Sequence, residues 1–231
     1  MLVAQIYRIL GEFETAIHIY NRLIRLPLFA LDKRYFFHLN VDLWGLLLET
    51  NNPDADICFE VIKKSPVLQE EVAGLIHEAY NTQWRINVRE GRLVRIDTQA
   101  MENALLTHNL SQDMVGSLTY ALIHYMKGKK KLATKWAEKS QEIHKKEAGV
   151  ETVTVFGLKV LAFMAHTEYE RGSLAKSKEY AKRALVVAFQ VQEKPPLHQG
   201  NMYDILSNIH ARQGDENMAI KFQKKARKLL Q

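Results

Sequence analysis

Apolar residues in this chain recur at the spacing of one helix face, in pairs of segments joined by a short turn. Before Gly172, the residues Leu161, Met164, Ala165 and Tyr169 share one face of a helix. After this glycine, a second stripe combines small residues with apolar and aromatic ones. No stretch alternates apolar and polar residues as a half-buried strand does. The pattern predicts an all-α fold made of helical hairpins.

The helix-turn-helix unit is repeated along the chain. Its clearest copies are Leu161–Ala188 and Tyr203–Leu230, another copy at the start of the chain covers Leu2–Ile24, and a fourth copy turns at Gly128. Six turn markers are spaced by 41, 39, 37, 44 and 42 residues: Gly11, Asn52, Gly91, Gly128, Gly172 and Gly214. Because one such unit cannot bury its apolar face alone, neighbouring units stack on one another. We therefore expect a right-handed α-solenoid of about six hairpins that forms a single domain over residues 1–231.

A large aromatic residue recurs at the corresponding place in three second helices, at Trp136, Tyr180 and Phe222. A recurrent aromatic residue in a helical repeat is typical of the core between the two helices rather than of a ligand site. The single cysteine, Cys58, excludes an intramolecular disulfide and is expected to be a packed thiol.

Composition places the chain among ordinary globular proteins, with 47% hydrophobic and 25% charged residues in 231. No apolar run reaches the roughly 18 residues that a membrane span needs, so we expect no membrane insertion. The first residues carry no secretory signal, because Arg8, Glu12 and Glu14 interrupt the apolar positions. We expect a cytoplasmic protein.

The net charge of +6 is concentrated in two cationic runs, Lys127–Lys131 and Lys221–Lys228. One interpretation is that Lys-rich second helices present a solvated outer face. The alternative is contact with nucleic acid or with an acidic partner. The first run has no interleaved aromatic residues, which favours the solvated face.

The residues around the turns carry a resemblance to a known family. Large–small pairs precede the turns, small residues follow them, and the matching positions are Val3-Ala4, Tyr7, Gly11, Ala16, Tyr20, Trp44-Gly45, Met164-Ala165, Gly172, Ala184, Leu206-Ser207, Gly214, Ala219 and Ala226. In this pattern Ser177 stands where alanine is usual. The units resemble tetratricopeptide repeats, which implies a solenoid whose first helices line a concave, protein-binding groove.

The chain departs from that family in two ways. Its intervals exceed the usual 34 residues, and such long repeats resemble the sensor domains of bacterial transcription regulators and the peptide-pheromone receptors of Gram-positive bacteria. The first helix is also short and begins Met-Leu-Val-Ala, whereas solenoids normally cap their ends with polar faces. We expect either that the chain is part of a longer protein or that a partner or a second copy covers this end.

No catalytic or metal-binding motif is complete. His77-Glu78 begins like the helix of a zinc protease, but the second histidine is absent. The histidines His124, His166 and His210 occur once per hairpin, and packing or groove positions explain them better than a metal does. We expect no enzyme, no cofactor and no metal site.

The resemblance implies which side chains point into the groove. Alignment on the turn residues places Glu78 and Thr82 inward on the third hairpin. The residues expected to contact a protein or peptide partner are Asn81, Arg85, Arg89, Tyr125, Phe163, His166, Tyr169, Asn201, Asp204, Asn208 and Arg212. Amides can hydrogen-bond a peptide backbone, and arginine can hold a carboxylate. The alternative is that these are only the polar faces of amphipathic helices, and Asn201 also fits a helix cap.

These observations predict a protein- or peptide-binding scaffold, used as the sensor or interaction domain of a regulatory protein such as a transcription regulator. Two alternatives remain open. One is a structural adaptor subunit of a multi-protein assembly. The other is nucleic-acid contact through a basic convex face.

Overall fold

The computed structural model describes residues 2–27, 32–90, 113–148, 154–191 and 196–230, and these form helices joined by turns. The expected all-α helical-repeat fold is confirmed. The chain divides into two compact units, residues 1–110 (unit 1) and residues 111–231 (unit 2), which are described separately. A single continuous domain stays a prediction.

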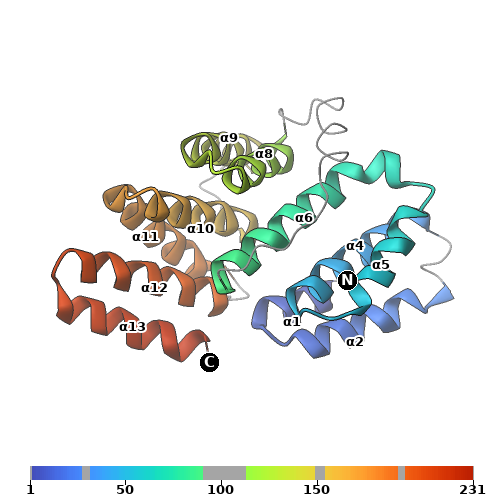
Figure 1. Ribbon diagram of the computed structural model, residues 1–231, viewed down its shortest axis with the longest axis horizontal. Coiled ribbons are helices and arrows are strands. Elements are labelled where there is room, and N and C mark those ends of the chain that lie inside the picture. The colour runs from blue at the N-terminus through green and yellow to red at the C-terminus, as the bar shows by residue number, and fades with distance from the viewer. Residues whose placement is uncertain (1, 28–31, 91–112, 149–153, 192–195, 231) are drawn as a thin grey trace. The chain divides into compact units, whose positions relative to one another are not determined.

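Unit 1 contains two hairpins followed by a long helix (Figure 1). Its helices are α1 (Leu2–Leu10), α2 (Phe13–Ile24), α4 (Lys33–Glu49), α5 (Asp54–Lys63) and α6 (Leu68–Glu90). Helix α4 packs against α2, α5 and α6, so it is the centre of this unit. Its residues Phe37, Leu39 and Leu46 are among the most deeply buried large side chains.

Unit 2 consists of three hairpins stacked in chain order (Figure 1). Its helices are α8 (Met114–Met126), α9 (Lys130–Ala148), α10 (Val155–Glu170), α11 (Leu174–Gln190), α12 (Pro196–Arg212) and α13 (Glu216–Leu230). Helix α9 contacts α10, α11 contacts α12, and the first helices α10 and α12 also contact each other. Neighbouring hairpins therefore bury each other's apolar faces, as repeat stacking requires.

The same turn closes each of the five hairpins that the structure describes. One residue adopts a positive φ in each turn: Gly11 (83°), Asn51 (53°), Gly128 (73°), Gly172 (82°) and Gly214 (76°). The N–H of the following residue donates to the carbonyl five positions earlier, as from Ser173 to Glu168 at 2.9 Å. This is the Schellman motif, which caps a helix with a left-handed residue. Four glycine markers are confirmed, the Asn52 marker lies one residue after the turn residue, and Gly91 lies outside the described residues.

An aromatic side chain eight residues after the turn residue packs across three of these hairpins. Phe59 stacks on Trp44 with ring centroids 4.9 Å apart, and Trp136 stacks on Tyr120 at the same distance. Phe222 stacks on Tyr203 at 5.9 Å. The expectation that the recurrent aromatic residue belongs to the packing between helices is confirmed at Trp136 and Phe222 by these ring contacts and at Tyr180 by its burial, at 9% exposure.

A buried serine explains the departure from alanine in the second helix of the fifth predicted hairpin. The Ser177 hydroxyl donates a 2.7 Å hydrogen bond to the Ala165 carbonyl on the facing helix. In the last hairpin, Ser207 makes the reverse connection, donating to the Ala219 carbonyl at 2.8 Å. Both contacts need a small residue where the two helices cross closely.

Replacement of Gly172 by alanine is expected to destabilise unit 2 by about 1–2 kcal/mol, because an L-residue is strained at this φ. The effect should come from the backbone alone, since nothing lies within 4 Å of a Cβ at this position. Urea unfolding of Gly172→Ala and Gly172→Asn tests the idea. Asparagine tolerates the left-handed region better than alanine does, so Gly172→Asn should lose less stability than Gly172→Ala. Equal losses in the two variants would contradict backbone strain as the cause.

Candidate functional site

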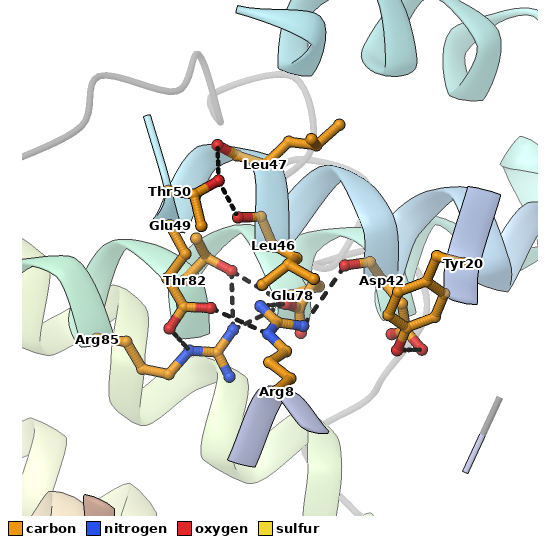
Figure 2. A network of polar contacts seen from close by, with 10 residues as sticks. All are labelled: Arg8, Tyr20, Asp42, Leu46, Leu47, Glu49, Thr50, Glu78, Thr82 and Arg85. Carbon is orange, nitrogen blue, oxygen red and sulfur yellow. Dashed lines mark hydrogen bonds and ion pairs between the residues drawn. The ribbon is translucent and has the colours of Figure 1, made fainter. Parts of the chain in front are cut away.

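A buried ring of ion pairs joins the first helices of unit 1 (Figure 2). Arg8 of α1 lies between two carboxylates, with Nε 2.9 Å from Glu49 Oε2 and Nη2 2.7 Å from Glu78 Oε1. Arg85 of α6 contacts the same two carboxylates. Its Nη2 is 2.9 Å from Glu78 Oε1, and its Nε is 3.1 Å from Glu49 Oε1 without hydrogen-bond geometry. Positive and negative groups thus alternate around a closed ring that links α1, α4 and α6.

The ring is deep enough for its electrostatics to matter. The Glu49 side chain is 3% exposed and the Arg8 side chain 10%. Burial disfavours the charged form of Glu78, but the Arg8 and Arg85 guanidinium groups outweigh it and hold the pKa of this carboxyl well below its usual range. The pKa of Glu49 is lowered in the same way, by Arg85 and Arg8 against burial. Both glutamates are therefore anions at neutral pH.

Asp42 lies beside the ring and behaves differently. Burial and the negative charge of Glu78 raise the pKa of its carboxyl, and the attraction of Arg8 does not compensate. The carboxyl accepts hydrogen bonds from Gln5 at 3.0 Å and from the Tyr20 hydroxyl at 3.2 Å. Asp42 therefore ties both helices of the first hairpin to α4.

The glycine of the Trp44-Gly45 pair makes room for the ring. A Cβ at Gly45 would overlap the Glu78 carboxylate and lie 2.9 Å from Thr82 Oγ1. Thr82 in turn donates a 3.0 Å hydrogen bond to Glu78 Oε1. The small residue in the repeat pattern of α4 is thus required by a polar group on α6.

The groove residues expected in unit 1 have different surroundings. Arg85 is held by the two carboxylates of the ring, with 18% of its side chain exposed. Asn81 is buried at 7% exposure. The side chain of Arg89 lies outside the described residues. The sequence had indicated Glu78 and Thr82 on this face but not Arg8 or Glu49, whose charges on apolar first helices were the available signal.

Unit 2 brings several of the expected groove residues together. The Tyr125 ring of α8 meets Phe163 of α10, with centroids 5.7 Å apart, and His166 at 6.2 Å. The Arg212 guanidinium of α12 lies 4.6 Å from the centroid of the Tyr169 ring of α10. Side chains of three successive first helices therefore meet on one face.

Exposure divides this group into a floor and an accessible surface. Tyr125 is 5% exposed and Phe163 only 1%, so both pack beneath the surface. The residues that solvent reaches form what we term the first-helix face of unit 2: His166, Tyr169, Asp204, Asn208 and Arg212. The last three are exposed and occupy one side of α12, because they are four residues apart. Asn201 lies one turn before them and is half-buried.

Polar contacts within this face orient its side chains. The Asn208 amide donates to Asp204 Oδ2 at 3.1 Å. Although Asp204 is exposed as a residue, partial burial of its carboxyl raises the pKa of this group, and the hydrogen bond opposes the rise without cancelling it. Amide, carboxyl and guanidinium groups thus follow one another along α12.

A charged cluster borders the face at Glu170. Its carboxylate is 3.0 Å from Lys130 Nζ and 3.4 Å from His166 Nε2, and it accepts a hydrogen bond from Tyr125. Burial acts to raise the pKa of this carboxyl, but the hydrogen bonds from His166, Lys130 and Tyr125 lower it to about 2. Glu170 is therefore a fixed anion beside the aromatic floor.

The described residues contain no group of three or more His, Cys, Asp or Glu side chains that could hold a metal ion. Cys58 is buried, with Sγ 3.3 Å from the Asn40 carbonyl oxygen, and burial raises the pKa of its thiol to about 12. It is the packed thiol that the sequence indicated. No helix within the described ranges combines the length and hydropathy of a membrane span.

Comparison with known proteins gives one finding at the start of the chain. Residues 1–27 match the family model of the tetratricopeptide repeat. This segment contains α1, α2 and their turn, and the four other described hairpins have the same turn geometry. The comparison with curated proteins gives no match. The chain thus contains a segment similar to a tetratricopeptide repeat within an all-α helical-repeat fold, and repeats of this kind typically bind proteins or peptides.

Breaking the ion-pair ring is expected to destabilise unit 1 strongly. Arg8→Met leaves two buried carboxylates to a single arginine, and an uncompensated buried charge costs about 3–5 kcal/mol. Arg34→Met is the matched control. The Arg34 side chain is 63% exposed, and its ion pair with Glu71 is longer, at 3.5 Å. The Arg34→Met substitution should lower the free energy of unfolding by less than about 1 kcal/mol. Chemical unfolding measures the free energy of unfolding of both variants. Similar losses of stability in the two would show that the ring does not stabilise the unit.

The low pKa of Glu170 predicts an acid-labile contribution to the stability of unit 2. The folded-state pKa lies below the ordinary value of 4.5, so the contribution is complete above about pH 4.5 and is lost as the pH falls toward 2. Hydrogen exchange of the α10 amides measures the opening free energy over this range. As the pH falls, the opening free energy of the wild type should decrease more than that of Glu170→Gln. Parallel pH profiles would refute this role of Glu170.

Proposed function

We propose that this chain is a helical-repeat scaffold that binds an extended protein segment on the first-helix face of unit 2. The observation that carries the proposal is the row of exposed polar side chains on α12, Asp204, Asn208 and Arg212, beside the Tyr169 ring. This row combines hydrogen-bond donors, acceptors and a rigid aromatic surface on helices that are fixed by packing.

The chemistry of the row suits a peptide. The Asn208 amide can donate to a backbone carbonyl and accept from a backbone N–H. The Arg212 guanidinium can hold a carboxylate with two parallel hydrogen bonds. Because Arg212 already lies over Tyr169, less side-chain freedom is lost when a ligand binds.

Unit 2 is favoured over unit 1 for this role because of the way each uses its arginines. In unit 1 the guanidinium of Arg85 is occupied by Glu49 and Glu78. The nearest counterpart in unit 2, Arg212, is exposed and contacts a ring. An incoming carboxylate would therefore compete with two buried ion pairs at Arg85 but with a solvated surface at Arg212.

As part of this proposal, the scaffold acts as the sensor or interaction domain of a regulatory protein. Binding across α10 and α12 would favour the arrangement of hairpins that the bound segment contacts best. The shift in population would then be transmitted to whatever protein the scaffold serves. A structural adaptor would bind a partner on this face in the same way but would not change its arrangement.

A display library of random peptides, panned against three proteins, tests the binding face. These are the wild type, Asn208→Ala/Arg212→Ala, and the control Lys221→Ala/Lys224→Ala on α13. All four positions are exposed, so helicity should be unchanged. Selected peptides should bind the first variant at least about tenfold more weakly, since a hydrogen bond to a charged group contributes about 1.5–3 kcal/mol.

The control distinguishes the alternatives. Binding that survives Asn208→Ala/Arg212→Ala and falls in the lysine variant would move the partner to the basic second helices. Binding of oligonucleotides that falls steeply with salt and is lost in the lysine variant would favour nucleic-acid contact. Either outcome would overturn the proposed face.

A further inference from the structure

Charge is divided between the two layers of helices in unit 2. Helix α9 has six lysines against three glutamates, α11 has four cations against one glutamate, and α13 has five against one. The second helices therefore carry +3, +3 and +4, although the whole chain carries only +6. The first helices are nearly neutral, because α8 has no Lys, Arg, Asp or Glu, α10 has one lysine against two glutamates, and α12 has one arginine and one aspartate.

A pocket opens in this basic layer between α9 and α11. Its volume is about 240 Å³, and Leu161 of α10 with Val186 and Val187 of α11 provide apolar lining. Lys145 of α9 and Lys182 of α11 also line it, as does Arg183. Pockets for whole small molecules measure about 300–1,000 Å³. This smaller pocket suits one large side chain.

Exposed apolar residues continue the lining outward along α11. Val186 is 57% exposed and Phe189, almost one turn further along, is 55% exposed. Single exposed apolar side chains are common on protein surfaces. Here, however, Val186 lines a pocket and Phe189 follows it on the same helix. The apolar surface is therefore larger than the pocket, as expected for contact with a protein segment.

Arg183 beside the pocket can accept a new partner. Arg183 Nη1 is 3.6 Å from Glu179 Oε1, and its guanidinium lies 5.8 Å from the centroid of the Tyr180 ring. The two side chains of this ion pair are 38% and 66% exposed, so the pair is weak in water. Glu179 is also the only acidic residue of α11. A carboxylate from a partner would therefore find excess positive charge here.

We propose that the α9–α11 pocket is a second docking site, which takes an acidic protein segment. One large apolar side chain of the segment enters the pocket, and flanking carboxylates meet Lys182 and Arg183. Such an anchored side chain with charged surroundings is the usual form of a binding hot spot. Nucleic acid is less suited, because bases stack on flat aromatic faces, and the aromatic ring among the lining residues, His144, is only 7% exposed. The site is separate from the first-helix face and does not depend on it.

The test pans a display library in which a central position and its neighbours are all randomised. The targets are the wild type, Val186→Glu, Lys182→Glu/Arg183→Glu, and the control Ile220→Glu on α13. Ile220 is 51% exposed, so the control places the same new charge at a similarly exposed helical position in the basic layer. Glutamate is a good helix former, so these variants should fold.

The peptides selected on the wild type should include a class that carries a large apolar residue at the centre and Asp or Glu around it. Their affinity should fall at least about tenfold in Val186→Glu and in the charge-reversal variant. It should be unchanged in Ile220→Glu and in Asn208→Ala/Arg212→Ala. This last comparison separates the failure of this proposal from the failure of the first-helix face.

Three results would overturn the docking site. The first is the absence, among the selected peptides, of any class with a large apolar residue flanked by Asp or Glu. The second is binding to Val186→Glu that equals binding to the wild type. The third is a single-stranded oligonucleotide that binds the wild type and Val186→Glu alike but not Lys182→Glu/Arg183→Glu, which would identify a surface for nucleic acid.

Discussion

Reversal of the chain at one left-handed residue governs the architecture of both units. In each of the five hairpins that the structure describes, this residue ends the first helix and lets the second begin within two or three residues. Such a short turn forces the two helices to run antiparallel and in contact. The outer apolar faces of each hairpin then remain uncovered until the next hairpin packs on them. Stacking thus follows from the turn, because a lone hairpin cannot remove enough apolar surface from water.

In unit 1, a directional interaction, the ring of ion pairs, is added to the non-directional stacking of apolar faces. Apolar stacking alone tolerates small shifts of one helix along another, whereas the ring of Arg8, Glu49, Glu78 and Arg85 is satisfied in one register only. Taking four charges out of water is costly, and their mutual attraction offsets that cost only while all four are present. Polar groups on the first helices of this unit therefore stabilise one particular arrangement of α1, α4 and α6.

Unit 2 separates two kinds of surface by alternating its helices. First helices contribute a face that is almost neutral and rich in amide and aromatic groups. Second helices contribute a strongly basic layer with an apolar pocket between α9 and α11. Because consecutive helices in the chain fall in opposite layers, the exposed residues of the two surfaces lie on different helices. A scaffold of this kind can offer two independent binding surfaces, and this is the basis of both proposals.

Local features of the sequence determined the helices, their turns and the class of fold. A left-handed φ strongly favours glycine, so Gly11, Gly128, Gly172 and Gly214 could be recognised without knowledge of any distant residue. The pairing of large with small residues before each turn is local in the same sense. These signals are sufficient for an all-α repeat protein. They also indicate which way a side chain faces on its own helix.

Only the tertiary structure decided what each of those side chains meets. Arg85 looked like a ligand-binding residue, but carboxylates on its own helix and on α4 occupy it, and Arg8 reaches Glu78 across 70 positions of sequence. Tyr125 and Phe163 face the expected side yet lie under its surface. Helical periodicity gives a direction relative to one axis. The contacts of a side chain, its depth of burial and the pocket between α9 and α11 depend on how separate helices pack against one another. No local sequence pattern encodes the distance and angle between those helices.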